Sequence, residues 1–366
     1  MDQAASTGST RNDPHAQERA ARQAPLLLHS LSLFEEIFAL LFRERRIRRV
    51  VEVGVESGQV SAMYARLGAE VVHCVEPLPT EEMRANIAGH DALDLVERPS
   101  PEAFDELPVA DLYVLDGDHN YAVVSRELDW ITRNAPDALV VLHDVLWPWG
   151  RRDLYYQPTP LDVADRQPDG PDGPTVWHDG VTPAGFIGAG AFTNAVEAGG
   201  ERNGVCTAVE DVLAEAPGAW WLRIVPAVFG LGVLGRAESP AAEAICAALD
   251  PIASSGLLAA LENNRIALYT RVLQMQYDAA AHAGHADELS ELVAGQQQEI
   301  QELRGELEPL RAAARELREM RLARHELEQE RDRLRTELSP LPSLRRWADR
   351  ALVKTRGGGS RDRDQR

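Results

Sequence analysis

Residues 49–145 alternate between short apolar runs and stretches of helical character, and this rhythm limits the chain to few folds. The apolar runs read RRVVEVGV, AEVVHCVEP, ADLYVLDGD and DALVVLHDV, and the helical segment SGQVSAMYARLG separates the first two. Strands that alternate with helices predict a mostly parallel sheet covered on both faces. We therefore expect an α/β fold that binds ligands at the carboxyl ends of its strands.

The stretch VLDGDHNY, residues 114–121, places Asp116, Asp118 and His119 directly after a buried strand. An isolated charge taken out of water is costly unless it is paired or bound to a ligand. The end of this strand is therefore a candidate site.

Residues 148–204 interrupt the rhythm with many Pro, Gly and Asp residues and several aromatic side chains. An insert this long is either functional or disordered, and its aromatic residues argue against full disorder. Beyond it, WWLRIVPAVFGLGVL predicts two strands joined as a hairpin that closes the sheet. We expect the core domain to span residues 25–235, followed by a helical connector over 236–286.

Residues 287–338 carry apolar or small side chains at alternating spacings of three and four, with one skip at Met320. This heptad pattern predicts a coiled coil, and through it a homo-oligomer; the alternative is a long solvated helix folded back on the core. Pro309 lies inside the pattern and is expected to kink or split the helix. The basic tail, residues 339–366, is expected to be flexible, with weak contact to a membrane surface as a further possibility.

The chain has 366 residues and a formal net charge of -20, which argues against a general nucleic-acid-binding surface. Its three cysteines, Cys74, Cys206 and Cys246, are widely spaced and suit neither a disulfide framework nor a four-thiolate zinc site. Residues 1–24 lack the order of a signal peptide and read as a disordered lead-in. We expect a cytoplasmic protein without a transmembrane span.

The first strand ends in VEVGVESG, where glycines allow a tight turn and a close approach of backbone to a ligand. The spacing is not the G-x-G-x-x-G of dinucleotide binders. The second strand ends in Glu76, where a carboxylate can accept hydrogen bonds from both ribose hydroxyls. Together these features predict a cofactor that contains a nucleoside.

Three features carry a resemblance to a known family: the motif E-x-G-x-x-x-G formed by Glu52, Gly54 and Gly58, the carboxylate of Glu76 after the second strand, and the segments DLYVLDGDHNY and LVVLHDV. In these features the chain resembles the class I S-adenosylmethionine-dependent methyltransferases. The last two segments resemble the subgroup of macrocin and sugar O-methyltransferases and cephalosporin hydroxylase-like proteins. The resemblance implies a Rossmann-like sheet of seven strands. It further implies the cofactor's methionine part near Glu52 and Gly54, within a turn that includes Glu56, Ser57 and Gly58. Ribose is then expected on Glu76, and adenine near Ser100 and Asp116.

In metal-dependent O-methyltransferases of this fold, acidic residues that end the fourth and fifth strands hold a divalent cation. Asp116 or Asp118, together with Asp144, match those positions, and His143 stands where an Asp or Asn is common. Magnesium prefers oxygen ligands, whereas imidazole suits manganese, iron or zinc. The sequence therefore leaves open which metal binds, and also whether any metal binds.

Methyl transfer to a hydroxyl requires an oriented acceptor and a group that takes its proton. Asp118, His119 and His143 are the candidate bases. Alternatively, Asp118 caps the following helix and His119 orients a loop. Asn203 precedes another helix and is expected to cap it.

The aromatic insert is the expected lid over the acceptor, and Arg151, Arg152, Asp153 and His178 in it suit a sugar or another polyhydroxylated molecule. Alternatively, Trp147 and Trp149 only cover the edge of the sheet.

The interpretation that these features favour is a methyltransferase acting on a hydroxyl of a sugar or glycosylated natural product, with S-adenosylmethionine and, if a metal takes part, Mg²⁺ or Mn²⁺. Two alternatives stay open: an inactive scaffold assembled through its coil, and an iron-dependent hydroxylase-like enzyme built on His143, Asp144 and Asp116.

Overall fold

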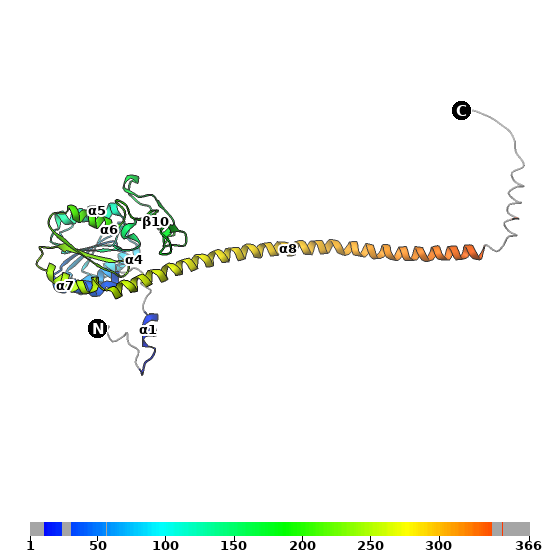
Figure 1. Cartoon of the computed structure of the whole chain (residues 1–366), viewed down its shortest axis with the longest axis horizontal. Helices are drawn as coiled ribbons and strands as arrows, with labels where there is room; N and C mark the ends of the chain where they lie inside the picture. Colours follow the sequence, from blue (N-terminus) through cyan, green and yellow to red (C-terminus); the bar gives the residue numbers. More distant parts are fainter. Residues whose placement is uncertain (1–10, 24–30, 56, 339–345, 347–366) are drawn as a thin grey trace, which may run out of the picture. The chain divides into compact units, whose positions relative to one another are not determined.

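The computed structural model describes residues 11–23, 31–55, 57–338 and 346. Its centre is a sheet of seven strands in the order β11-β12-β5-β4-β1-β2-β3 (Figure 1). The strands are β1 (Arg49–Val53), β2 (Val71–Val75), β3 (Leu93–Val96), β4 (Leu112–Leu115), β5 (Leu139–His143), β11 (Trp220–Val225) and β12 (Leu231–Arg236). The α/β prediction is confirmed, because β1 to β5 are all parallel and helices lie on both faces.

The predicted hairpin that closes the sheet is also confirmed. Strand β11 pairs antiparallel with β12, and β12 pairs antiparallel with β5. The turn between them contains Val228 and Phe229, which both have positive φ angles of 47° and 65°. This turn brings their backbone next to the carboxyl end of β5.

Two apolar cores lie on opposite faces of the sheet, because side chains alternate along each strand. Val50 belongs to one core and Val51 to the other. The helices that contribute to the first core are α2 (Glu35–Glu44), α3 (Gln59–Leu67), α4 (Glu81–Ala88) and α7 (Ala242–Ala253). Those that contribute to the second are α5 (Tyr121–Asn134) and α6 (Val205–Glu215).

The insert at 148–204 is folded. It forms an antiparallel sheet of β6 (Leu154–Tyr156), β10 (Phe192–Ala195) and β7 (Asp169–Gly170), beside the pair β8 (Gly173–Pro174) and β9 (Val181–Thr182). A third apolar cluster joins the insert to the β11–β12 turn and contains Trp149, Leu154, Phe186 and Phe229. Short 3₁₀ turns occupy η2 (Leu31–Phe34), η3 (Glu102–Asp105), η4 (Trp149–Arg151) and η5 (Val163–Asp165).

The compact unit extends beyond Gly235, where we expected the core domain to end. Helix α7 buries Ile245 and Leu249 in the first core, and α8 (Gly256–Glu337) packs Ile266 and Tyr269 against the third cluster. The chain divides into one unit ending at Ala281 and a second beginning at His282. The start of α8 is thus part of the folded domain.

Pro309 is expected from the sequence to kink or split the helix; α8 is continuous through it, so of these two effects the split does not occur. A proline within a helix removes one backbone hydrogen bond, and the helix on either side tolerates that loss here.

Part of the N-terminal lead-in is helical, in α1 (Ala16–Gln23). Of the basic tail, only Arg346 is described. Among the described helices, none alone is long and apolar enough to span a membrane. The pair α7 and α8, bent by 55° at the break between them, passes that test of length and composition together.

Candidate active site

The site lies where parallel strands end. Asp116 follows β4 and Asp144 follows β5, while His143 is the last residue of β5. The amide of Asp116 donates to the carbonyl of Val53 at 2.9 Å, so the ends of β4 and β1 stay in register. Polar side chains separated by tens of residues therefore converge at one edge of the sheet.

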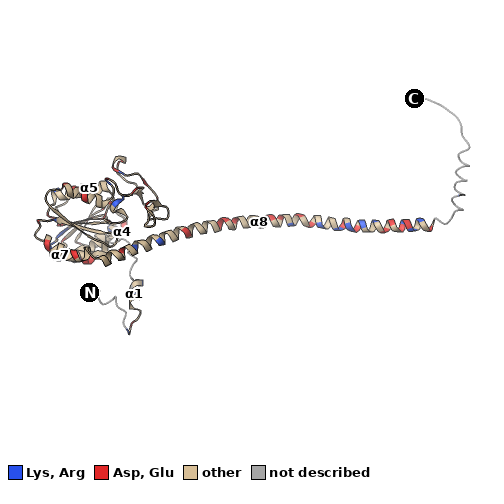
Figure 2. Ribbon diagram, viewed as in Figure 1, with Lys and Arg blue, Asp and Glu red and all other residues tan. Residues whose placement is uncertain are grey.

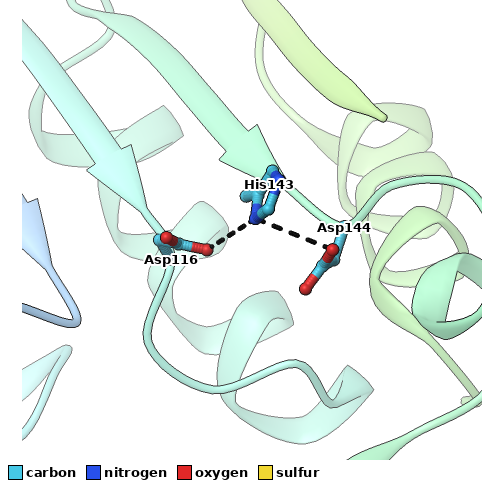
Figure 3. A group of neighbouring side chains, drawn as sticks. All are labelled: Asp116, His143 and Asp144. Atoms are coloured by element: carbon cyan, nitrogen blue, oxygen red, sulfur yellow. Dashed lines mark hydrogen bonds and ion pairs between the residues drawn. The ribbon is translucent and has the colours of Figure 1, made fainter. Parts of the chain in front are cut away.

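Asp116, His143 and Asp144 form a group whose ligand atoms lie within 4.8 Å of one another (Figure 3). Nδ1 of His143 is 3.0 Å from Oδ1 of Asp116 and 3.6 Å from Oδ1 of Asp144. His143 and Asp144 are buried, and Asp116 is partly exposed. These are the three residues that the sequence proposed as metal ligands.

The orientation of the His143 ring is fixed from its other side. Nε2 lies 2.9 Å from the carbonyl oxygen of Val228, which can only accept, so Nε2 carries a proton. Nδ1 therefore faces the two carboxylates with either a proton or a lone pair. A backbone carbonyl that receives the second ring N–H is the usual support of a metal-binding histidine.

Burial opposes a charged His143, but the carboxylates of Asp144 and Asp116 outweigh it and raise its pKa to about 9. The two carboxylates thus favour a positive charge between them. A proton on Nδ1 of His143 supplies such a charge, and so would a divalent cation held by one nitrogen and carboxylate oxygens. The donor set fits a metal.

His119 completes the group from the loop after β4. Its Nδ1 is 3.3 Å from Oδ2 of Asp144, and its Nε2 is 4.0 Å from Oδ1 of Asp116. The ring is buried and stacks on Trp149 at a centroid distance of 5.8 Å. Tyr156 from the insert lies 6.2 Å away and is 46% exposed.

Asp118 lies near both His119 and the acidic residues Glu76 and Glu127. Burial raises the pKa of Asp118, and the charge of His119 opposes that shift. Burial also raises the pKa of Glu76 and of Glu127, with a smaller contribution from the charge of Asp118. Asp118 does not cap α5, as the alternative interpretation held. That cap is Asn120, whose side chain accepts from the amide of Val123 at 2.9 Å and donates to Asp118.

The glycine-rich turn after β1 packs directly on the turn after β4. Gly54 has φ of +82°, and a Cβ there would lie 2.3 Å from the carbonyl oxygen of Asp116. Gly58 has φ of +77° and is the N-cap residue of α3, and the preceding carbonyl of Ser57 accepts from Asn86. Only glycine allows so close an approach of two backbones at position 54. Glu56 lies outside the described residues.

Glu76 follows β2 and accepts from the amide of Leu78 at 3.0 Å. Its side chain is partly exposed, and burial of the remainder raises its pKa. The structure therefore leaves part of the Glu76 side chain open to solvent beside the glycine turn, as a residue that contacts a ligand requires.

Glu52 and Ser100, also proposed for the cofactor, each have a protein partner. The hydroxyl of Ser61 donates to Glu52, whose carboxyl is buried against α3 with a pKa raised by burial to about 8. The hydroxyl of Ser100 donates to the buried Glu127 of α5.

Three charged residues of the insert, Arg151, Arg152 and Asp153, make contacts that hold it in place. Asp153 accepts from the amides of Tyr121 and Gly204 and from the Tyr155 hydroxyl. Arg152 donates to backbone carbonyls of β10 and its neighbour, and Arg151 pairs with Glu210 of α6. These contacts hold the insert in place, while His178, the fourth residue of the predicted set, is exposed; a role of the four in binding a sugar stays a prediction.

Asn203 does not cap α6, so that prediction is wrong as well. Its side chain accepts from the amide of Asp153 at 2.8 Å and donates to the carbonyls of Glu197 and Gly199. Gly204 occupies the cap position. Trp149 is buried, as the sheet-covering alternative expected, but it also stacks on His119.

Three residues near the site escaped sequence reasoning: Glu127, Val228 and Glu262. The sequence predicts Glu127 to be an exposed residue of a helix. Val228 contacts His143 through its backbone carbonyl, and no pattern of side chains in the sequence predicts such a contact. Glu262 lies in α8, far along the chain, and accepts from the amide of Phe229 at 2.8 Å.

Residues 51–145 match the sequence model of a family described as a methyltransferase domain. No curated protein matches. Solved structures that are similar include a methyltransferase from Podospora anserina bound to S-adenosylhomocysteine, with 15% identity, 60% of this chain and 86% of that chain covered, and a TM-score of 0.36.

A second is an O-methyltransferase from Streptomyces achromogenes involved in tomaymycin synthesis, in complex with S-adenosylmethionine, with 17% identity, coverage of 60% and 86%, and a TM-score of 0.35. A third is an N1-methyltransferase from Burkholderia thailandensis, with 14% identity, coverage of 61% and 83%, and a TM-score of 0.32. The fold is therefore the predicted Rossmann-like sheet of seven strands, and residues 51–145 within it match a methyltransferase domain.

Proposed function

We propose that the protein transfers a methyl group from S-adenosylmethionine to a hydroxyl of a sugar or a glycosylated natural product, assisted by a divalent cation. The observation that carries this proposal is the group of Asp116, His143 and Asp144 with His119 beside it. An ion site and a base next to each other are what transfer to a weakly acidic hydroxyl needs.

S-adenosylmethionine supplies an activated methyl group, so the chain itself must position two molecules and accept a proton. Gly54 and Gly58 allow the tight turn on which the cofactor is proposed to bind, and Glu76 would offer its carboxylate to the ribose hydroxyls. Adenine is proposed to lie near Ser100 and Asp116, and Ser100 shares its neighbour Glu127 with Asp118.

Asp116, His143 and Asp144 would hold the cation, which when bound would make an acceptor hydroxyl more acidic. Two carboxylates and one imidazole suit Mn²⁺ better than an all-oxygen site would, and they still accommodate Mg²⁺ with water as additional ligands. The Val228 carbonyl keeps Nδ1 of His143 directed toward the ion site.

His119 is the base that fits best among the three candidates. Asp144, 3.3 Å from Nδ1, can orient the ring and stabilise the imidazolium that forms when the ring takes a proton. His143 is committed to Val228 and the carboxylates, and Asp118 lies toward the cofactor residues.

The acceptor is proposed to contact Tyr156, because this exposed ring lies next to His119 on the insert. An aromatic face can pack against the apolar face of a sugar while the hydroxyls remain available to His119 and the cation.

Calorimetric titration of the full chain with S-adenosylmethionine tests this function, repeated after chelation and with added Mg²⁺ or Mn²⁺. We expect micromolar binding that Glu76→Ala abolishes and Glu70→Ala, an exposed control, leaves unchanged. Methyl transfer to hydroxylated acceptors should require the cation. Absence of cofactor binding under every condition contradicts the proposal and favours the scaffold alternative.

One observation also favours an iron-dependent hydroxylase-like activity. His143, His119 and Asp144 place two imidazoles and a carboxylate close together, as in facial iron sites. Oxygen consumption that depends on Fe²⁺, without methyl transfer, would select this function.

A further inference from the structure

The second unit of the chain presents a long apolar seam that the described part of the chain leaves uncovered. Every residue of α8 from His282 to Glu337 is exposed except Glu328. Leu289, Ile300, Leu303 and Leu310 are 63%, 47%, 50% and 66% exposed. A helix with this much exposed apolar surface has the pattern of one that packs against another helix.

The seam follows a strict heptad from Leu289 to Leu317. Val293, Ile300, Leu307 and Ala314 occupy position a, and Leu289, Gln296, Leu303, Leu310 and Leu317 occupy position d. Two of these four a residues, Val293 and Ile300, are β-branched and four of the five d residues are leucine, a composition that favours two parallel strands over three or four. Pro309 falls at position c, which faces away from the seam, so it does not obstruct a partner.

The charges beside the seam distinguish the two possible orientations. Glu299 and Glu306 occupy position g, and Arg304 and Arg311 occupy the following e positions. In a parallel pair in register, each g residue faces the next e residue of the other helix, which here pairs glutamate with arginine. In an antiparallel pair, g faces g and e faces e, so like charges meet.

After the skip at Met320, Glu330 at g again precedes Arg335 at e, but position a then holds Arg324 and Arg331, so the apolar seam ends at Leu317. Figure 2 shows acidic and basic residues interspersed along this part of α8. Some of them pair within the helix, as Arg311 does with Glu308 at 3.4 Å, but exposed pairs of this kind are weak and can exchange for contacts between helices.

We propose that residues 289–317 bind the same segment of a second copy of this chain as a parallel, in-register, two-stranded coiled coil. Gln296 meets its own counterpart at the seam in that register, where two amides can hydrogen-bond to each other, and any shift would bury them against apolar side chains. The second unit thus links two methyltransferase domains, and this inference does not depend on what the domains methylate.

Sedimentation equilibrium of the full chain gives the number of strands, and we expect twice the mass of one chain at micromolar concentration. Ile300→Asp puts a charge in the seam and should raise the dimer dissociation constant at least about 100-fold. Gln298→Asp, at the outward f position, is the matched control and should leave it unchanged. The melting temperature of the domain should be the same in both variants.

Oxidative crosslinking gives the orientation. Leu289→Cys should form a disulfide-linked dimer, because two d positions meet only in a parallel, in-register pair, whereas Gln298→Cys and the wild-type chain should not. A monomeric wild type, a mass of three or more chains, or a dimer that Leu289→Cys fails to crosslink would each overturn the proposal.

Discussion

Nε2 of His143 donates a hydrogen bond to the carbonyl oxygen of Val228 across 2.9 Å, which links the end of β5 to the turn between β11 and β12. That turn is held in a left-handed conformation that is rare for valine and phenylalanine. Glu262 accepts from the amide of Phe229, and the Arg265 guanidinium lies 4.3 Å from the Phe229 ring centroid. The start of α8 thus fixes the direction of a candidate metal ligand.

This relationship predicts that Glu262 is a positioning residue. Glu262→Ala removes the acceptor for Phe229, frees the turn, and should weaken Mn²⁺ binding about 10- to 100-fold, as loss of outer support does for metal-binding histidines. Glu262→Gln keeps an acceptor oxygen and should retain most of the affinity. Glu243→Ala, an exposed residue on α7, is the control, and titration with Mn²⁺ is the measurement. An equal loss of Mn²⁺ affinity in the Gln and Ala variants would show that the oxygen accepting from the Phe229 amide does not support the metal site.

Gly54 provides a second prediction, because a side chain there would collide with the Asp116 carbonyl. Gly54→Ala should abolish S-adenosylmethionine binding and destabilise the domain. Gly68 also has a positive φ, +119°, but nothing lies within 4 Å of the position that a Cβ would take there. Gly68→Ala should therefore cost only about 1–2 kcal/mol of backbone strain and keep cofactor binding. Calorimetry measures the cofactor affinity of the two variants, and denaturant unfolding measures their stability. Equal affinity and equal stability in Gly54→Ala and Gly68→Ala would mean that close packing at Gly54 is unimportant.

A third prediction concerns His119. If it accepts the acceptor proton, His119→Gln should lower kcat about 10²- to 10⁴-fold and leave S-adenosylmethionine affinity unchanged. Asp118→Asn is the comparison, because Asp118 lies beside the cofactor residues and should affect cofactor affinity more than kcat. The reverse pattern would assign the base to Asp118.

The sheet was predictable because each strand is a short apolar run followed by polar residues, and both features are local in sequence. The convergence of Asp116, His143 and Asp144 was predictable too, since parallel strands bring their carboxyl ends to one edge. The hydrogen bonds of Asp153 and Asn203 to backbone groups were not predictable. The sequence alone does not distinguish a polar residue of a long insert that binds backbone from one that binds a ligand. The contact of Glu262 with the Phe229 amide depends on packing between distant segments.

The last prediction concerns pH and the buried Glu127. Burial raises its pKa to about 8, against a usual value of 4.5, with a smaller opposing effect from the Ser100 hydrogen bond. Between pH 4.5 and 8 the folded state binds this proton and the unfolded chain does not, so the free energy of unfolding should fall as pH rises through this range. Glu127→Gln should reduce that fall, measured by urea unfolding at about pH 5.5 and about pH 8 without metal or cofactor. Glu52 and His143 also have raised pKa values, of about 8 and 9, and leave a remaining dependence of the same sign. An unchanged dependence in the variant would show that Glu127 is already ionised in the folded protein.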